Sequence, residues 1–139
     1  MRTVFADSGY WQAVINPRDD LHQKAIDLAK RIYPLHILTS EMVLVEVLNY
    51  FSGRGPDLRT TVVKMVDAIS SDPNVTVVPQ TRDLFRRAVQ RFKSRSDKTW
   101  SVTDCASFLI MEERGIDEAL AYDRDFEQAG FRALLRGNE

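Results

Sequence analysis

Short apolar runs alternate with longer amphipathic segments along most of the chain. The short runs are rich in valine, isoleucine and leucine, which predicts buried strands. They lie at residues 4–6, 37–38, 75–78, 119–122 and 131–135. In the segments between them, apolar residues recur at spacings of three and four, which predicts helices. These segments are residues 9–15, 20–33, 41–51, 57–69, 81–92, 104–114 and 126–129.

Strands that alternate with helices favour parallel pairing, because each crossover helix then covers one face of the sheet. We therefore expect an α/β fold, a three-layer α/β/α sandwich with a central, mainly parallel sheet. The length of 139 residues fits one domain, 1–139, that buries its own core.

Composition narrows the function by exclusion. A net charge of −1 excludes a chain that binds nucleic acid through its overall charge, so any such contact needs a local patch. Cys105 is the only cysteine, which excludes an internal disulfide and a cysteine-based zinc site. Asp7 interrupts the first apolar run, so we expect no leader, and no segment approaches the roughly 20 apolar residues that a membrane span needs. We therefore expect a cytoplasmic protein.

Asp7 is the first candidate for chemistry, because it follows the predicted strand at 4–6. In open α/β sheets, ligands bind beyond the carboxyl ends of strands. The alternative is that Asp7 only caps the next helix, which is a common role for aspartate.

Glu46 lies in a helical segment, and its own neighbours, next to it in sequence and one helical turn away, are mostly apolar. Acids are rarely buried without a partner, because an isolated buried charge is costly. Two interpretations stay open: a structural ion pair with an arginine or lysine, or a metal or catalytic role.

Asp104 stands at the start of another predicted helix, next to Thr103. Either residue could be the N-cap. If Thr103 is the cap, Asp104 can project from the first turn with Ser107 on the same helical face.

Asp123 and Asp125 follow the predicted strand at 119–122. Asp125 has Gln128 three residues later, which is typical of a capping box and indicates a structural role. Asp123 closes the strand as Asp7 does, so we favour Asp123 for the site and keep Asp125 as the second choice.

If these strand ends meet, Asp7, Glu46, Asp104 and Asp123 form a cluster of carboxylates. Two like charges about 4 Å apart repel by about 4 kcal/mol at an effective dielectric of 20, so the cluster implies a bound cation. Oxygen ligands favour Mg²⁺ or Mn²⁺ over zinc. Such an ion suits phosphodiester hydrolysis, because it activates water and neutralises charge on phosphate oxygens.

Four segments of the chain together resemble the acidic motifs of PIN-domain ribonucleases, and the compact size resembles their VapC-type toxins. The segments are residues 4–8, 38–46, 101–107 and 121–131. The resemblance implies a parallel sheet flanked by helices and Mg²⁺- or Mn²⁺-dependent endonucleolytic cleavage of RNA. The matching acids are Asp7, Glu46, Asp104 and Asp123, both as catalytic residues and as metal ligands. Ser8 and Thr39 match small polar positions beside the acids.

The resemblance also implies partners: an RNA substrate, a cognate antitoxin that covers the acidic pocket, and a second copy in a homodimer. The helices between Tyr10 and Phe51 carry many apolar residues, which either form such an interface or belong to the core.

A basic stretch between Arg82 and Lys98 could grip RNA phosphates, or could be a solvated helix face. Its cations are Arg82, Arg86, Arg87, Arg91, Lys93, Arg95 and Lys98, and only Asp83 and Asp97 oppose them within the stretch. Trp100 could stack on a base or belong to the core.

Two other functions compete with the nuclease. A strand-end aspartate with magnesium also occurs in aspartyl-phosphate enzymes, namely haloacid-dehalogenase phosphatases and response-regulator receivers. Gly9 stands where the phosphatases have a second aspartate, and no acidic pair precedes the strand-end aspartate as it does in receivers. A catalytically inactive module that binds RNA or sequesters an antitoxin is the other alternative.

Overall fold

A computed structural model describes residues 1–137 and shows an α/β architecture. The strands are β1 (Arg2–Ala6), β2 (Leu35–Ser40), β3 (Val75–Val78), β4 (Glu118–Leu120) and β5 (Arg132–Ala133). The α-helices are α1 (Ser8–Ile15), α2 (His22–Arg31), α3 (Glu41–Phe51), α4 (Pro56–Ser71), α5 (Arg82–Ser94), α6 (Val102–Arg114) and α7 (Arg124–Gln128). A short 3₁₀ helix, η1 (Leu134–Arg136), follows β5.

The five strands form one parallel sheet in the order β3-β2-β1-β4-β5. β1 is central, and its Phe5 pairs with Leu38 of β2 on one side and Ala119 of β4 on the other. Val4, Phe5 and Ala6 are fully buried, as expected for a parallel strand covered on both faces.

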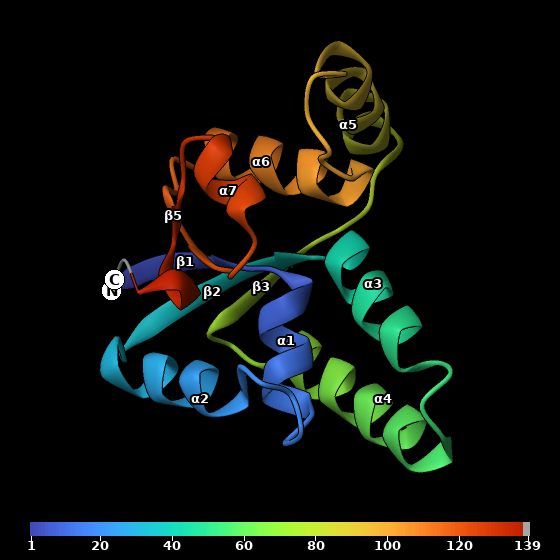
Figure 1. The fold of residues 1–139 in the computed structure, drawn as a ribbon, viewed down its shortest axis with the longest axis vertical. Coiled ribbons are helices and arrows are strands. Elements are labelled where there is room, and N and C mark those ends of the chain that lie inside the picture. The colour runs from blue at the N-terminus through green and yellow to red at the C-terminus, as the bar shows by residue number, and fades with distance from the viewer. Residues whose placement is uncertain (138–139) are drawn as a thin grey trace.

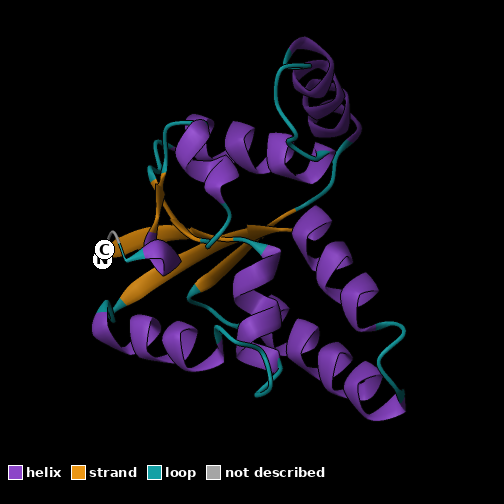
Figure 2. Ribbon diagram, in the orientation of Figure 1, coloured by secondary structure: helices purple, strands orange, loops and turns teal. Residues whose placement is uncertain are grey.

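Helices cover both faces of this sheet, which confirms the three-layer α/β/α prediction (Figures 1 and 2). In the view of Figure 1, α6 and α7 lie above the sheet, and α1, α2 and α4 lie below it. α3 lies at one end of the sheet and contacts α1, α4 and α6. α5 packs on α6 and projects away from the sheet.

The main differences from the predicted elements are at the C-terminal end. The fourth strand is Glu118–Leu120, so it ends two residues before the predicted end at Tyr122. The fifth pairs only at Arg132 and Ala133, and the chain then turns into η1. Leu135 donates its backbone N–H to Ala121 at 3.1 Å, which holds this turn against the end of β4.

The aromatic part of the core lies beneath α6. Phe108 meets Trp100 and Phe126 edge to face at 5.1 Å, and Phe131 packs against the same ring. These contacts hold the start of α6 and the start of α7 against each other, and both helices carry candidate site residues at their first turns.

Candidate active site

The chain changes side within the sheet between β1 and β4. From β1 it runs to β2 and β3 on one side, and it later returns to β4 and β5 on the other. Such a switch leaves a crevice outside the carboxyl ends of the two strands, where ligands bind in open α/β sheets. Asp7 directly follows β1, and Asp123 lies three residues after the end of β4.

Asp7 is buried at this crevice, with 8% of its surface exposed. It occupies the N-cap position of α1, but its carboxylate makes no capping hydrogen bond. Burial, followed by the charges of Asp104, Glu46 and Asp123, raises the pKa of Asp7 from 3.8 to about 8, against the opposing effect of the Ser8 backbone amide. The simple capping role is therefore not supported, and Asp7 is held in an environment that disfavours its charge.

Glu46 lies in the middle of α3, and its charge raises the pKa values of Asp7 and Asp104. Ser40 begins that helix by accepting a hydrogen bond from the Val43 backbone N–H at 3.1 Å. Glu46 is half-buried, and Val45 and Asn49 beside it are exposed, so its surroundings are less apolar than the sequence suggested. Within residues 1–137 Glu46 has no ion pair, which contradicts the alternative of a structural pair with an arginine or lysine.

Thr39 supports Asp7 from the neighbouring strand. Its hydroxyl donates to the carbonyl of Ala6 at 2.9 Å and accepts from Trp11 Nε1 at 3.3 Å. The residue is fully buried on β2. The small polar position that the sequence singled out thus fixes the backbone immediately before Asp7.

Asp104 stands in the first turn of α6, but the cap is different from the two predicted candidates. Ser101 is the N-cap, and it forms a capping box with Asp104: Asp104 N–H donates to Ser101 Oγ at 2.9 Å, and Ser101 N–H donates to Asp104 Oδ2 at 3.0 Å. Ser, Thr and Asp are all good N-caps, so the sequence could not distinguish them. The box orients the Asp104 carboxylate, and Oδ1 takes no part in it.

The helix cap that the sequence assigned to Asp125 is made by Asp123. Asp123 is the N-cap of α7 and accepts from the Asp125 backbone N–H at 3.0 Å, so the capping role given to Asp125 is wrong. The helix begins at Arg124, two residues before the predicted start. Burial together with the charges of Asp123 and Asp104 raises the pKa of Asp125 to about 6. Asp125 is therefore a fifth carboxyl group of this crevice.

The four predicted acids come together electrostatically. The pKa of Asp104 is raised by burial and by Asp123 and Glu46, and the same acids act on Asp7. Among the residues that the structure describes, no ion pair involves Asp7, Glu46, Asp104, Asp123 or Asp125.

A buried acid at the opposite end of the sheet provides a comparison. Glu118, at the start of β4, binds Arg2 through two hydrogen bonds of 2.8 Å and Arg132 through a contact of 2.9 Å. Those contacts, led by the hydrogen bond from Arg2, hold the pKa of Glu118 below its usual value. The fold therefore neutralises a structural acid with arginines, while the acids of the crevice lack such partners in the described part of the chain.

The crevice does not already have the geometry of a complete metal site. No three His, Cys, Asp or Glu side chains within residues 1–137 are grouped so that they could hold one ion. The four predicted carboxylates are thus close enough to raise the pKa values of Asp7 and Asp104, but they are not arranged as a preformed set of metal ligands.

The basic stretch is more neutralised than its own sequence indicated. Arg87 pairs with Asp83 and Glu113, Arg91 pairs with Glu112 at 2.8 Å, and Arg95 pairs with Asp97 at 3.1 Å. Glu112 and Glu113 come from α6, which local sequence could not reveal. Over the described residues, the cations of α5 without a carboxylate partner are Arg82, Arg86 and Lys93.

Trp100 and Cys105 belong to the core. Trp100 is 6% exposed and packs against Phe108, so the alternative of base stacking by this ring is wrong. Cys105 is fully buried.

Comparison with known proteins identifies the family. No protein-family model matches the chain. The 23S rRNA-specific endonuclease VapC20 from two strains of Mycobacterium tuberculosis is 30% identical over 134 residues, which covers 92% of this chain and 95% of the relative. The chain belongs to the VapC family of PIN-domain endoribonuclease toxins. A crystal structure of M. tuberculosis VapC20, described as a sarcin–ricin loop cleaving toxin, superposes with a TM-score of 0.84 and covers 94% of this chain and 97% of its own.

Membership of the VapC family narrows the set of functions that the sequence left open. It supports an endoribonuclease with an RNA substrate and a cognate antitoxin, and it excludes the aspartyl-phosphate enzymes. Among the described residues, no helix of this VapC protein is both long and apolar enough to cross a membrane.

Proposed function

We propose that this VapC protein cleaves RNA phosphodiester bonds with a divalent cation, Mg²⁺ or Mn²⁺, bound at the carboxyl edge of its sheet. The observation that carries the proposal is Asp7: a buried carboxyl group beside several other acids, with no cationic side chain paired to it among residues 1–137. A cation is the partner that this donor set lacks, and oxygen donors suit a hard ion.

Asp7, Glu46, Asp104 and Asp123 are the residues that we assign to metal binding and catalysis. Mg²⁺ keeps several water molecules and uses one or two protein carboxylates directly, so a preformed group of three ligands is not required. The remaining carboxylates would accept hydrogen bonds from water molecules that the ion retains. When bound, the ion supplies an activated water and neutralises charge on the phosphate oxygens.

The chain's own residues orient these groups. The Ser101 capping box fixes Asp104, the hydrogen bond from Thr39 to the Ala6 carbonyl fixes the strand before Asp7, and the α3 N-cap fixes Glu46. Carboxylates whose backbone and side chains are held by such hydrogen bonds keep their positions while substrate binds.

For the substrate, we extend to this chain the class that its relatives' names describe. VapC20 is described as specific for 23S rRNA and as cleaving the sarcin–ricin loop. We therefore propose a structured loop of ribosomal RNA as the substrate, with a cognate antitoxin as the partner that restrains cleavage.

We also propose a homodimer, and α5 supplies its surface. The helices between Tyr10 and Phe51, which the sequence offered for this role, bury most of their apolar residues in the core. Large apolar side chains are exposed instead at Phe85, Val89 and Phe92, which share one face of α5. Phe85 lies four residues before Val89, and Phe92 lies three residues after it. An antiparallel pair of α5 helices that crosses at Val89 would therefore place Phe85 of each copy against Phe92 of the other.

The test of the nuclease proposal is a metal titration with purified protein and a labelled rRNA stem-loop. We expect cleavage with Mg²⁺ or Mn²⁺, none with EDTA, and loss of cleavage for Asp104→Asn, which retains a side chain able to accept the Ser101 hydrogen bond. Arg132→Gln, at the opposite end of the sheet, is the matched control and should cleave normally. RNA binding without cleavage at any metal concentration would instead show an inactive binding module.

A further inference from the structure

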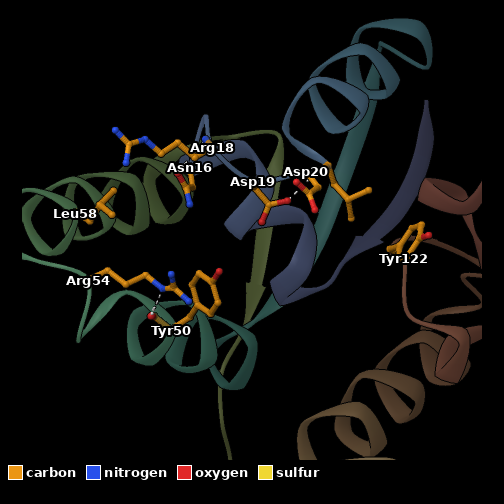
Figure 3. Close-up of a pocket in the computed structure, with 9 residues that line it drawn as sticks. Asn16, Arg18, Asp19, Asp20, Tyr50, Arg54, Leu58 and Tyr122 are labelled. Carbon is orange, nitrogen blue, oxygen red and sulfur yellow. Dashed lines mark hydrogen bonds between the residues drawn. The ribbon is translucent and has the colours of Figure 1, made fainter.

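A cleft lies next to Tyr122, the residue that precedes Asp123, and the proposed mechanism does not use it. It has a volume of about 830 Å³, and the α1–α2 loop, the end of α3, the start of α4 and the segment after β4 line it. Figure 3 shows Tyr50 and Arg54 on one side, Asp19 and Asp20 on another, and Tyr122 across from them. Sites for small organic ligands have volumes of roughly 300–1,000 Å³, so the cleft can hold a nucleotide.

Each of the two tyrosines of this cleft lies within four residues of a proposed catalytic acid in the sequence. Tyr50 comes four residues after Glu46 on α3, so both side chains project from the same helical face. Tyr122 directly precedes Asp123 and is 47% exposed. Tyr122 also lines a neighbouring cleft together with Asp123, Gly9 and Gln12, so it is shared by the two clefts, and the second of them reaches Asp123.

Cations accompany both rings. The Arg54 guanidinium lies 4.0 Å from the centre of the Tyr50 ring. Arg136 lies 4.9 Å and Lys24 5.8 Å from the centre of the Tyr122 ring. Aromatic rings with adjacent cations are the combination with which proteins stack unpaired bases and hold the phosphates next to them.

The α1–α2 loop adds carboxylates to the same cleft. Asp19 Oδ1 accepts the Leu21 backbone N–H at 2.8 Å, so it is engaged in its own turn. Asp20 is exposed and makes no hydrogen bond with another described residue. A carboxylate repels phosphate, but it accepts hydrogen bonds from the amino groups of adenine, cytosine and guanine. This favours a base edge at Asp20.

We propose that this cleft binds one unstacked nucleotide of the RNA next to the scissile phosphate, with Tyr122 and Tyr50 as stacking rings and Asp20 as a base-reading group. This inference rests on the proposed nuclease function and assigns the part of that site which recognises the base. RNA-binding proteins read sequence mainly in single-stranded loops whose bases can be splayed out onto such rings. We expect a base with an exocyclic amino group to bind here more tightly than uracil, which offers the Asp20 carboxylate only its ring N3–H.

The test measures RNA affinity without turnover, in full-length protein that carries Asp104→Asn. Labelled loop oligonucleotides that differ at a single unpaired position next to the cleaved bond report Kd by fluorescence anisotropy. Adding Tyr122→Ala should weaken binding by about ten-fold or more, because loss of one base–aromatic stack has an effect of that size. Tyr122→Phe keeps the ring and should bind normally. Tyr33→Ala is the matched control, because Tyr33 is an exposed tyrosine before β2, at the opposite end of the sheet.

The same assay tests the base-reading group. Asp20→Asn should reduce the preference for amino-bearing bases over uracil, and Asp67→Asn, an exposed acid on α4, should not. Unchanged Kd for Tyr122→Ala, or an unchanged base preference for Asp20→Asn, would overturn the cleft assignment. A change of oligomeric state in Tyr122→Ala with unchanged RNA affinity would make the cleft an interface between copies and would also overturn it. Failure of the wild-type protein to cleave RNA with metal would instead contradict the proposed function, since binding here is measured separately.

Discussion

The hydroxyl of Thr39 on β2 donates a hydrogen bond to the carbonyl of Ala6 on β1 at 2.9 Å. Ala6 is the last residue of its strand and directly precedes Asp7, so this bond fixes the point from which the buried acid projects. Because the Trp11 indole donates to the same hydroxyl, Thr39 links β1, β2 and α1 at the edge of the site.

Replacing Thr39 by valine should therefore affect both stability and activity. Valine keeps the shape but leaves the Trp11 indole N–H without its acceptor, which costs about 1–3 kcal/mol. We expect a lower Tm and a lower kcat for RNA cleavage, with RNA affinity little changed. Thr39→Ser retains the hydroxyl and should recover kcat. Equal kcat values for the valine and serine variants would show that the hydroxyl does not position Asp7.

Asp7→Asn should make the metal-free protein more stable while it abolishes cleavage. The folded-state pKa of Asp7 is raised from 3.8 to about 8, so ionising it destabilises the fold progressively as pH rises between these values. Removal of this charge should stabilise the metal-free protein at pH 8 by on the order of 1–2 kcal/mol. Thermal unfolding in EDTA measures this.

The same variant tests the cation. Mn²⁺ should raise the Tm of the wild-type protein, because a ligand that binds only the folded state stabilises it, and it should not raise the Tm of Asp7→Asn. An equal Mn²⁺ effect on both proteins would exclude Asp7 from the metal site.

Asp123→Asn should reduce cleavage more than Asp125→Asn does. The charge of Asp123 acts on buried Asp7, whereas Asp125 is coupled to Asp123 and Asp104. Asparagine is as good an N-cap as aspartate, so Asp123→Asn should change stability by less than about 0.5 kcal/mol. We expect a loss of at least 100-fold in kcat/KM for Asp123→Asn and a smaller loss for Asp125→Asn. The reverse order would assign the last acid of the site to Asp125.

The positions of the strands and helices along the chain, and of the acids at their ends, could be predicted because both depend on local pattern. The β-branched run Val75–Val78 and the capped segment Glu41–Phe51 form elements with the predicted bounds. A parallel sheet then brings the carboxyl ends of its strands to one edge, so Asp7 and Asp123 had to share it.

The roles of individual caps and ion pairs could not be predicted, for two different reasons. Ser101 competes with Thr103 and Asp104 for the same N-cap, and Asp123 competes with Asp125, because these residue types cap about equally well. The pair between Arg2 and Glu118 joins residues 116 positions apart, so only the folded chain reveals it.

Glu118→Gln should destabilise the protein at neutral pH and have little effect in acid. The folded-state pKa of Glu118 is lowered by Arg2 and Arg132, so the stabilisation is present above the unfolded value of 4.5 and is lost as pH falls through the lowered pKa. Because both arginines are partly exposed, we expect Glu118→Gln to lower the free energy of unfolding by only about 1–3 kcal/mol at pH 7. Urea unfolding at pH 7 and pH 3 measures the difference. A penalty independent of pH would show that packing, and not charge, is what the glutamate contributes.

The substitution Phe92→Glu should convert the proposed dimer into a monomer without loss of fold. Phe92 is 50% exposed on the outer face of α5, so the substitution removes little core packing. Two acidic groups opposite the partner's Phe85 would be desolvated on association, and that cost opposes dimerisation. Light scattering after size-exclusion chromatography measures the mass, and circular dichroism confirms the fold. Val63→Glu is the matched control, because Val63 is 52% exposed on α4 and lies outside the apolar face of α5. This variant should leave the mass unchanged. A dimer that persists in Phe92→Glu and in Phe85→Glu would place the interface elsewhere.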